Sequence, residues 1–276
     1  MNTQARDERS RGWSPLAKLA LWAGATALLA LVAQLCTLPL GAEYSIFTTG
    51  GGRSVLLALA LIVLLYLMAY DQRSAAEYGL VVDRRWAWHA LGGMGLGVAF
   101  YGAICVAAVG LGVFNLSLAG PSASTVATCL FAVVTAIPVA ALQQIIFSGY
   151  LPSTIRQRHS VATSVMAPSL AFGLFAGMAE ADGLLSYEGS SLAVGMFLIA
   201  SLLCLVRLSL GNISLPAGML AGAIVLRRVI RKLGLMAFNA DHDWTLWVAP
   251  HGDPRQGPLM WAALGLCIAA AAIVLW

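Results

Sequence analysis

The stretch ALQQIIFSGYLPSTIRQR, residues 141–158, joins the end of an apolar run to a Gly-Tyr-Leu turn and a basic tail. The apolar run begins near residue 122. It is long enough to cross a bilayer as a helix, which takes about 20 residues. A basic segment directly after such a run is typical of a helix that ends at the membrane surface. We therefore predict a transmembrane helix over residues 122–147.

Similar runs recur along almost the whole chain. Of its 276 residues 60% are hydrophobic and 10% charged, whereas soluble domains carry about a quarter charged residues. The fold class we predict is all-α, a polytopic membrane bundle of about eight transmembrane helices. After a tail at residues 1–16, residues 17–276 form one transmembrane domain. The predicted spans are 17–38, 54–70, 87–112, 122–147, 162–179, 191–208, 213–230 and 258–276.

The net charge of +4 is better explained by membrane topology than by nucleic acid, because the basic residues stand in short stretches beside apolar spans. Eight spans place both termini on one side, which we expect to be the cytoplasm of a bacterial inner membrane. The acidic loop with Glu180, Asp182 and Glu188 then lies outside. The basic stretch 227–232 falls on that outer side, although basic residues beside membrane spans favour the cytoplasmic side. Either the span count is wrong by one, or an interfacial helix there meets lipid phosphates.

The extramembrane segment 234–257 is too short to form a domain. We interpret its Trp244 and Trp247 as anchors at the membrane interface, with partner contact as the alternative. The sequences Gly93-x-x-x-Gly97 and Gly218-x-x-x-Gly222 are interpreted as helix-packing sites. The histidines and the five cysteines have no metal-ligand spacing on one helix, so we predict no metal site. A zinc site at the loop pair His242 and His251, with Asp241 or Asp243, is the less favoured alternative.

Residues 141–158 resemble the first motif of the CAAX-protease and bacteriocin-processing (CPBP, or Abi) family of intramembrane proteases. That motif reads Glu-Glu-x-x-x-Arg followed by Gly-Tyr-Leu. The aromatic and turn positions are kept here by Phe147, Gly149, Tyr150 and Leu151. The charged positions are replaced by Gln143, Gln144 and Ser148.

The second and third motifs of that family have counterparts without their polar residues. Phe-x-x-x-His corresponds to Phe172 and Ala176, and His-x-x-x-Asn corresponds to Ala221 and Val225. The sequence from Glu77 to Leu80 is similar to the lead-in of the family. The resemblance covers about residues 70–226 and implies a CPBP-like core, with a central cavity lined by these faces.

The resemblance implies a pseudoprotease with no catalytic residue, metal or cofactor. In the family the glutamates and histidines are thought to hold or activate a water, and the asparagine to stabilise the oxyanion. An amide cannot take up a proton near neutral pH, and general acid-base catalysis alone contributes about 10²- to 10⁴-fold in rate. An apolar side chain at mid-bilayer also avoids the cost of about 2.5–3.5 kcal/mol of an ionisable one.

Three functions remain open from the sequence. The first is an accessory, scaffold or assembly subunit that contacts another integral membrane protein as well as the lipid bilayer. The second is a binder or transporter of a lipid, peptide or small molecule that uses the former active-site cavity. Contacts in that cavity or with a partner would come from Phe147, Tyr150, Trp244 and Trp247. The third is an active protease with relocated catalytic residues.

Overall fold

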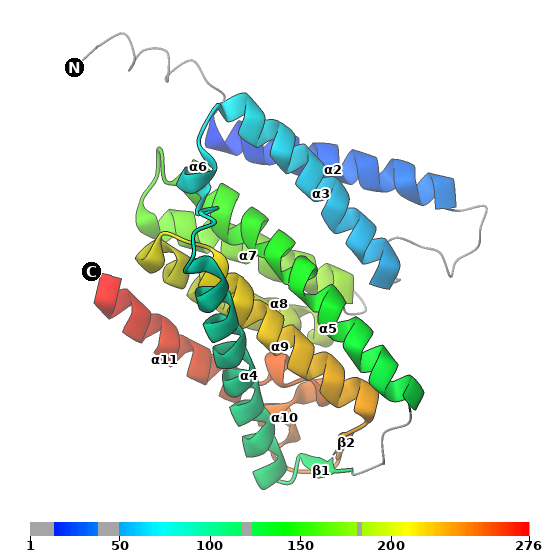
Figure 1. Cartoon of the computed structure of the whole chain (residues 1–276). Helices are drawn as coiled ribbons and strands as arrows, with labels where there is room; N and C mark the ends of the chain where they lie inside the picture. The colour runs from blue at the N-terminus through cyan, green and yellow to red at the C-terminus, as the bar shows by residue number, and fades with distance from the viewer. Residues whose placement is uncertain (1–13, 38–49, 118–122, 181–183, 276) are drawn as a thin grey trace. The chain divides into compact units, whose positions relative to one another are not determined.

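The computed structural model describes residues 14–37, 50–117, 123–180 and 184–275. The chain is all-α and about 80% helical (Figure 1). A helix stands at each of the eight ranges expected from the sequence. The long helices are α2 (Pro15–Thr37), α3 (Gly50–Asp71), α4 (Trp86–Gly110), α5 (Ala123–Gln144), α7 (Val161–Glu180), α8 (Tyr187–Leu210), α9 (Ser214–Leu233) and α11 (Pro258–Leu275). The predicted tail at residues 1–16 lies mostly outside the described residues, as does Asp182.

The chain divides into two compact units, residues 1–73 with 153–164 and residues 74–152 with 165–276. In the first unit, α2 and α3 are joined by two polar contacts between apolar helices. The indole N–H of Trp22 donates to the carbonyl of Ala60 over 3.1 Å. Lys18, in the first turn of α2, forms an ion pair with Asp71 at the end of α3. Each buried charge is thereby paired, as burial requires.

In the second unit, α4 and α9 run parallel and touch through their glycines. A Cβ added at Gly93 would lie 2.2 Å from the carbonyl oxygen of Leu215, and one at Gly97 would lie 2.0 Å from that of Met219. From the other side, Gly222 faces the backbone of Met94 in the same way. No real side chain fits at these distances, so only glycine permits this approach. The prediction that both Gly-x-x-x-Gly sequences serve helix packing is confirmed, and they pack on each other.

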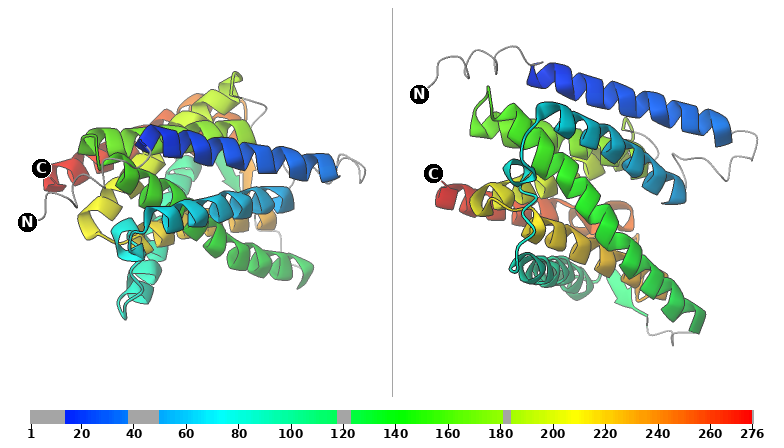
Figure 2. Two further views of the ribbon diagram at one scale, coloured as in Figure 1. Left: turned by 90° about the horizontal axis from the view of Figure 1, so that it is seen from above. Right: turned by 45° about the horizontal axis from the view of Figure 1, so that its top comes forward.

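Helix α5 does not end as a regular helix. It contains Pro138, and after Gln144 the chain continues as a π-helical turn, η4 (Ile145–Tyr150), followed by the short α6 (Leu151–Ile155). A π-helical turn shifts the hydrogen-bonding register and leaves carbonyl groups for other partners. In Figures 1 and 2 the N-terminal end of α5, drawn in green, projects beyond the helices beside it.

Helix α11 packs along α8. Met260 and Leu264 of α11 lie in one cluster with Leu198 and Leu202 of α8. Further along, Cys204 of α8 packs with apolar residues of α11, Ile268 and Ala271. Helices α8 and α11 therefore run in the same direction.

Short elements close one end of this unit. Strands β1 (Phe114–Leu116) and β2 (Met236–Phe238) pair antiparallel and join the chain after α4 to the chain after α9. The sequence analysis did not predict them. They are followed by α10 (Thr245–Val248) and two turns of 3-10 helix, η5 (Pro250–Gly252) and η6 (Pro254–Gln256). The lead-in before α4 also forms one such turn, η3 (Ala75–Tyr78).

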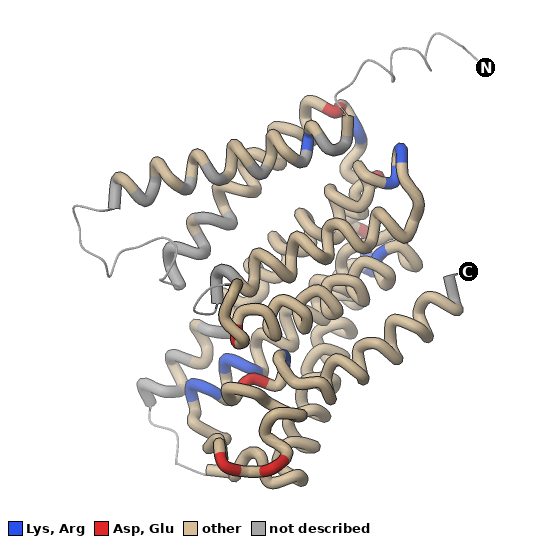
Figure 3. Tube along the Cα trace, turned by 180° about the vertical axis from the view of Figure 1, so that it is seen from behind, with Lys and Arg blue, Asp and Glu red and all other residues tan. Residues whose placement is uncertain are grey.

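Three helices among the described residues are long and apolar enough to cross a membrane: Trp86–Gly110, Cys129–Ile155 and Tyr187–Leu210. Shorter apolar stretches are Ala58–Asp71, Val161–Gly177 and Pro258–Ile273. Figure 3 shows long stretches of helix without a charged residue. Many large apolar side chains also face outward, among them Val106 at 71% and Phe131 at 71% exposure. These features indicate an integral membrane protein. The total of about eight spans stays a prediction.

Candidate functional site

The residues of the first motif lie at the junction of α5 and η4. Gln144 and Ser148 are four residues apart on one helical face, and both are buried. The hydroxyl of Ser148 donates to Gln144 Oε1 over 2.6 Å. Gln143 is half-buried. The two buried polar side chains are therefore hydrogen-bonded to one another.

A buried thiol extends this pair to two further helices. The Sγ of Cys204, on α8, lies 3.5 Å from Ser148 Oγ and donates to the carbonyl of Phe147 over 3.3 Å. The hydroxyl of Ser169, on α7, donates to the same sulfur over 3.9 Å. This thiol contact falls in the π-helical turn, whose residues do not follow the α-helical hydrogen-bonding pattern. We call Gln144, Ser148, Ser169 and Cys204 the buried polar network.

Aromatic side chains hold the turn around this network. The ring of Phe147 meets that of Phe172 of the second motif edge to face, with centroids 4.9 Å apart. The ring of Tyr150 lies 5.4 Å from that of Tyr78 in the lead-in segment. Between them, a Cβ at Gly149 would come within 2.9 Å of the Tyr78 carbonyl oxygen. Phe147, Gly149 and Tyr150 thus have a packing role at this turn.

The positions that the sequence analysis matched to the other two motifs are apolar and mostly buried. Ala221 packs with Ala140 of α5 and Leu203 of α8, one helical turn from Gln144 along α5. Ala176 is also buried, one turn beyond Phe172, and Val225 is half-buried. The structure therefore brings the first motif together with Phe172 and, one turn away, with Ala221. Ala176 and Val225 contribute only apolar side chains.

The turn between α8 and α9 attaches the lead-in segment to this region. The Arg207 guanidinium donates to the Glu77 carbonyl over 3.0 Å, and the Asn212 amide donates to the Val81 carbonyl over 3.0 Å. Gly211 ends α8 with a φ of +68°, which favours glycine. Arg207 is itself buried, and its guanidinium binds the backbone of the lead-in segment.

The buried polar network has little capacity for acid-base chemistry. Its members are an amide, two hydroxyls and a thiol, and the amide and hydroxyls neither gain nor lose a proton near neutral pH. Within the described part of the chain, no three His, Cys, Asp or Glu side chains gather where they could hold a metal ion. The arrangement can exchange hydrogen bonds, and it shapes the helix junction.

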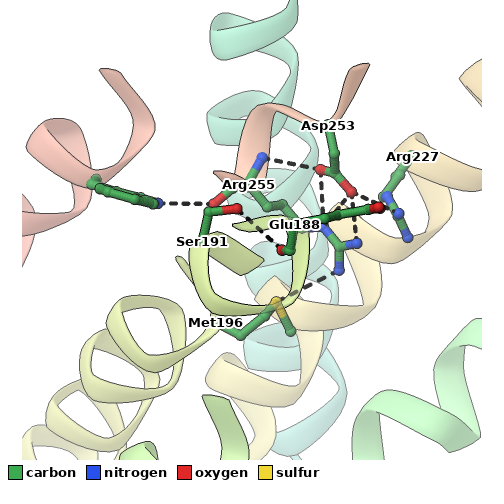
Figure 4. Close-up of polar contacts among 7 residues, drawn as sticks. Glu188, Ser191, Met196, Arg227, Asp253 and Arg255 are labelled. Carbon is green, nitrogen blue, oxygen red and sulfur yellow. Dashed lines mark hydrogen bonds and ion pairs between the residues drawn. The ribbon is translucent and has the colours of Figure 1, made fainter. Parts of the chain in front are cut away.

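A second polar cluster lies between α8, α9 and the segment before α11 (Figure 4). Arg227 donates to Asp253 Oδ2 over 2.8 Å, and Arg255 donates to the same oxygen over 2.7 Å. Burial alone raises the pKa of the Asp253 carboxyl. The charges of Arg255 and Arg227 and the hydrogen bonds from Arg255 outweigh it, and the pKa is held well below its usual range. We call these three residues the ionic cluster.

Neighbouring contacts hold the ionic cluster on α8 and α11. The Arg255 guanidinium also contacts the sulfur of Met196 at 3.6 Å. The indole N–H of Trp261 donates to the Arg255 carbonyl over 3.0 Å. A Cβ at Gly195 would lie 1.9 Å from that carbonyl oxygen, so α8 and this loop touch directly.

The ionic cluster bears on the basic stretch 227–232, which conflicts with the predicted topology. Arg227 is directed at Asp253, and Arg228 donates to Thr135 Oγ1 of α5 over 2.9 Å. Both side chains are half-buried, whereas Arg231 and Lys232 are exposed. Two of the four charges thus have partners inside the protein. They contribute less to the preference of this stretch for one side of a membrane than its composition indicates.

Sequence reasoning missed Ser169, Cys204 and Asp253. Cys204 stands in an apolar run and carries no local signal, and its contacts lie 35 to 57 residues away. Asp253 stands in a loop beside Pro254, where a charged residue is unremarkable. Trp244 and Trp247 are exposed at 50% and 59%. They lie apart from the buried polar network, on α10 and at its N-cap.

Comparison with protein-family models gave no match, and comparisons with curated proteins and with solved structures gave none either.

Proposed function

We propose that this chain is a non-catalytic integral membrane protein, built on a degenerate CAAX-protease-type frame, that serves as an accessory, scaffold or assembly subunit of another membrane protein. The observation that carries the proposal is that the polar side chains at the motif positions are hydrogen-bonded within the protein. Ser148 donates to Gln144 at 2.6 Å, and Cys204 donates to the carbonyl of Phe147 at 3.3 Å. A catalytic centre in these positions would instead present an acid or base to a water.

The course of the helices supports an eight-span arrangement. With alternating spans, the third and seventh run in the same direction, as do the sixth and eighth. Helices α4 and α9 meet in parallel at Gly97 and Met219 and at Gly93 and Leu215. Helices α8 and α11 are parallel as well. Both pairs have the relative direction that eight alternating crossings require.

The outward face of α4 is where we expect the partner. Gly92 and Gly95 have open space around them, in contrast to Gly93 and Gly97 on the opposite face. Ala99 continues this outward face one turn after Gly95 and is exposed. Small residues at this spacing let the backbone of a second transmembrane helix approach closely.

Photo-crosslinking tests the proposal. A benzophenone amino acid replaces Leu96, which is 53% exposed on the outward face of α4, and Leu266 of α11, 74% exposed, is the matched control. Irradiation in native membranes is expected to yield one discrete protein adduct from position 96 and none from 266. Lipid adducts alone at both positions would count against a partner.

The same preparation tests the alternative activities. A lipid, peptide or small molecule that remains bound after purification, and is lost when Gln144→Leu is introduced, would favour a ligand carrier instead. Cleavage of a membrane peptide that is abolished by Ser148→Ala would favour a protease. The proposal predicts neither result, because both side chains are buried and bonded to one another.

A further inference from the structure

The segment between α9 and α11 has two kinds of surface. On α10 and at its N-cap, Trp244, Leu246 and Trp247 are exposed at 50%, 66% and 59%. A few residues later Pro254, Arg255, Gln256 and Gly257 are all buried. A loop that lay wholly in water would have no reason to expose three large apolar side chains and to bury an arginine. The segment therefore has an apolar environment on its outside and protein on its inside.

The exposed tryptophans lie level with the end of α4. Val248, the last residue of α10, packs in one cluster with Ala108 of α4 and Val113. Tyr187, the first residue of α8, is exposed at this end too, and its ring lies 5.7 Å from that of His251. Trp and Tyr concentrate where the hydrocarbon of a bilayer meets the headgroups. These three aromatic residues form a group at one end of the unit.

A further tryptophan lies at the other end of α4. Trp88, in the first turn of α4, is 73% exposed. It precedes Ala108 by 20 residues (108 − 88), which is about 30 Å at the α-helical rise. The hydrocarbon core of a bilayer is also about 30 Å thick. Trp88 and the aromatic group at the other end of α4 thus have the separation of the two membrane interfaces.

Beyond α10 the chain turns back toward the middle of the bundle. The Arg255 carbonyl meets α8 at Gly195, which is 8 residues (195 − 187) after α8 begins. That is about 12 Å along the helix. Gly257 is packed just as closely on the Val248 carbonyl. Irregular backbone at such a depth is tolerated where protein surrounds it, and the burial of residues 254–257 meets that condition.

We propose that residues 244–257 form a re-entrant segment of the membrane domain. Trp244 and Trp247 lie in the lipid headgroup region on the side where α4 ends, and the chain then descends so that the ionic cluster lies below the headgroups, enclosed by α8, α9 and α11. The surface of α10 binds the lipid interface. The pairing of Asp253 with Arg227 and Arg255 makes charge at this depth tolerable, since ionisable residues inside a membrane pair with one another.

Tryptophan quenching tests the position of α10. The full chain is reconstituted in phosphatidylcholine vesicles, with bromine at carbons 6 and 7 or at carbons 11 and 12 of the acyl chains. The Trp244→Phe/Trp247→Phe variant is compared with wild type, so that the difference spectrum isolates these two residues. We expect that difference signal to be quenched at least twofold more by the shallow bromines than by the deep ones or by aqueous iodide. The single variants Trp244→Phe and Trp247→Phe give the same information if the double variant fails to fold. Trp88→Phe is the control for the opposite interface.

Hydrogen exchange tests the descent of the chain in the same vesicles. Backbone amides of residues 255–257 are expected to exchange at least a hundredfold more slowly than those of residues 240–243. Iodide quenching of Trp244 and Trp247 without bromolipid quenching would overturn the proposal, and so would fast amide exchange at residues 255–257. Neither result depends on a partner protein, so this proposal and the proposed function fail separately.

Discussion

The parallel contact of α4 with α9 makes a sharp prediction at Gly97. Alanine there places its Cβ 2.0 Å from the carbonyl oxygen of Met219, where about 3.4 Å is needed, and the obstacle is backbone rather than a flexible side chain. The helices must separate. Overpacking of this kind costs about 1–3 kcal/mol, occasionally more, and we place Gly97→Ala at about 3 kcal/mol. The better helix propensity of alanine returns about 1 kcal/mol, so the net loss is about 2 kcal/mol.

Gly95→Ala is the matched control. It is on the same helix, two residues away, and has no atom within 4 Å of an added Cβ. A thiol-reactive dye can follow heat unfolding in detergent, because the buried Cys105 and Cys204 react only when the protein opens, above the early signal of the exposed Cys267. At about 2–4 °C per kcal/mol, Gly97→Ala is expected to melt about 4–8 °C below wild type, and Gly95→Ala at or above it. Equal melting temperatures of the two variants would refute the α4 and α9 contact.

Three further predictions concern polar contacts. Ser148→Ala leaves Gln144 Oε1 without its donor and is expected to cost about 1–3 kcal/mol; adding Gln144→Leu should recover part of that loss, which a double-mutant cycle in the dye assay measures. Asp253→Asn removes the charge between two arginines and is expected to cost about 3 kcal/mol at pH 7. The pKa of Asp253 is depressed in the folded protein, so its ionised carboxylate contributes its full stabilisation above the unfolded pKa of about 3.9. That stabilisation is lost as the pH falls toward the pKa of the folded protein. The difference in free energy of unfolding between Asp253→Asn and wild type should therefore be constant from pH 7 to 5 and become smaller below about pH 4. The exposed control Asp243→Asn should show no such difference. Trp22→Phe loses one buried hydrogen bond to a backbone carbonyl of the neighbouring helix and is expected to cost about 1 kcal/mol in chemical denaturation.

The helices were predictable because their signal is local. Apolar runs of membrane length fix α4 and α8 to within a few residues, and Gly97 and Gly222 were recognised as packing positions from spacing alone. The partner of each Gly-x-x-x-Gly sequence was not predictable, since 28 glycines offer many such pairs. In the structure α4 lies beside α9, so the two Gly-x-x-x-Gly sequences pack against each other.

The remaining features depend on residues far apart in the chain. The β-ribbon pairs Phe114 with Phe238 over three residues each, too short for a period-two pattern to identify. Cys204 meets the first motif only because α8 packs against η4. The resemblance did direct attention to Ala176 and Ala221, at positions where the CPBP family has histidines. It gave no means of predicting that Gln144 and Ser148 would close on each other.

Native mass measurement tests the central claim most directly. The chain is extracted from its own membrane in mild detergent, and the intact assembly is weighed after the detergent is removed in the gas phase. The chain alone weighs 28.9 kDa. We predict a species heavier by the mass of a different protein, and we predict that Leu substitution at Gly95 returns it to 28.9 kDa while Leu substitution at Ala262 of α11, exposed on its outer face, does not. A wild-type preparation that contains only the bare chain, or only multiples of it, would contradict the account.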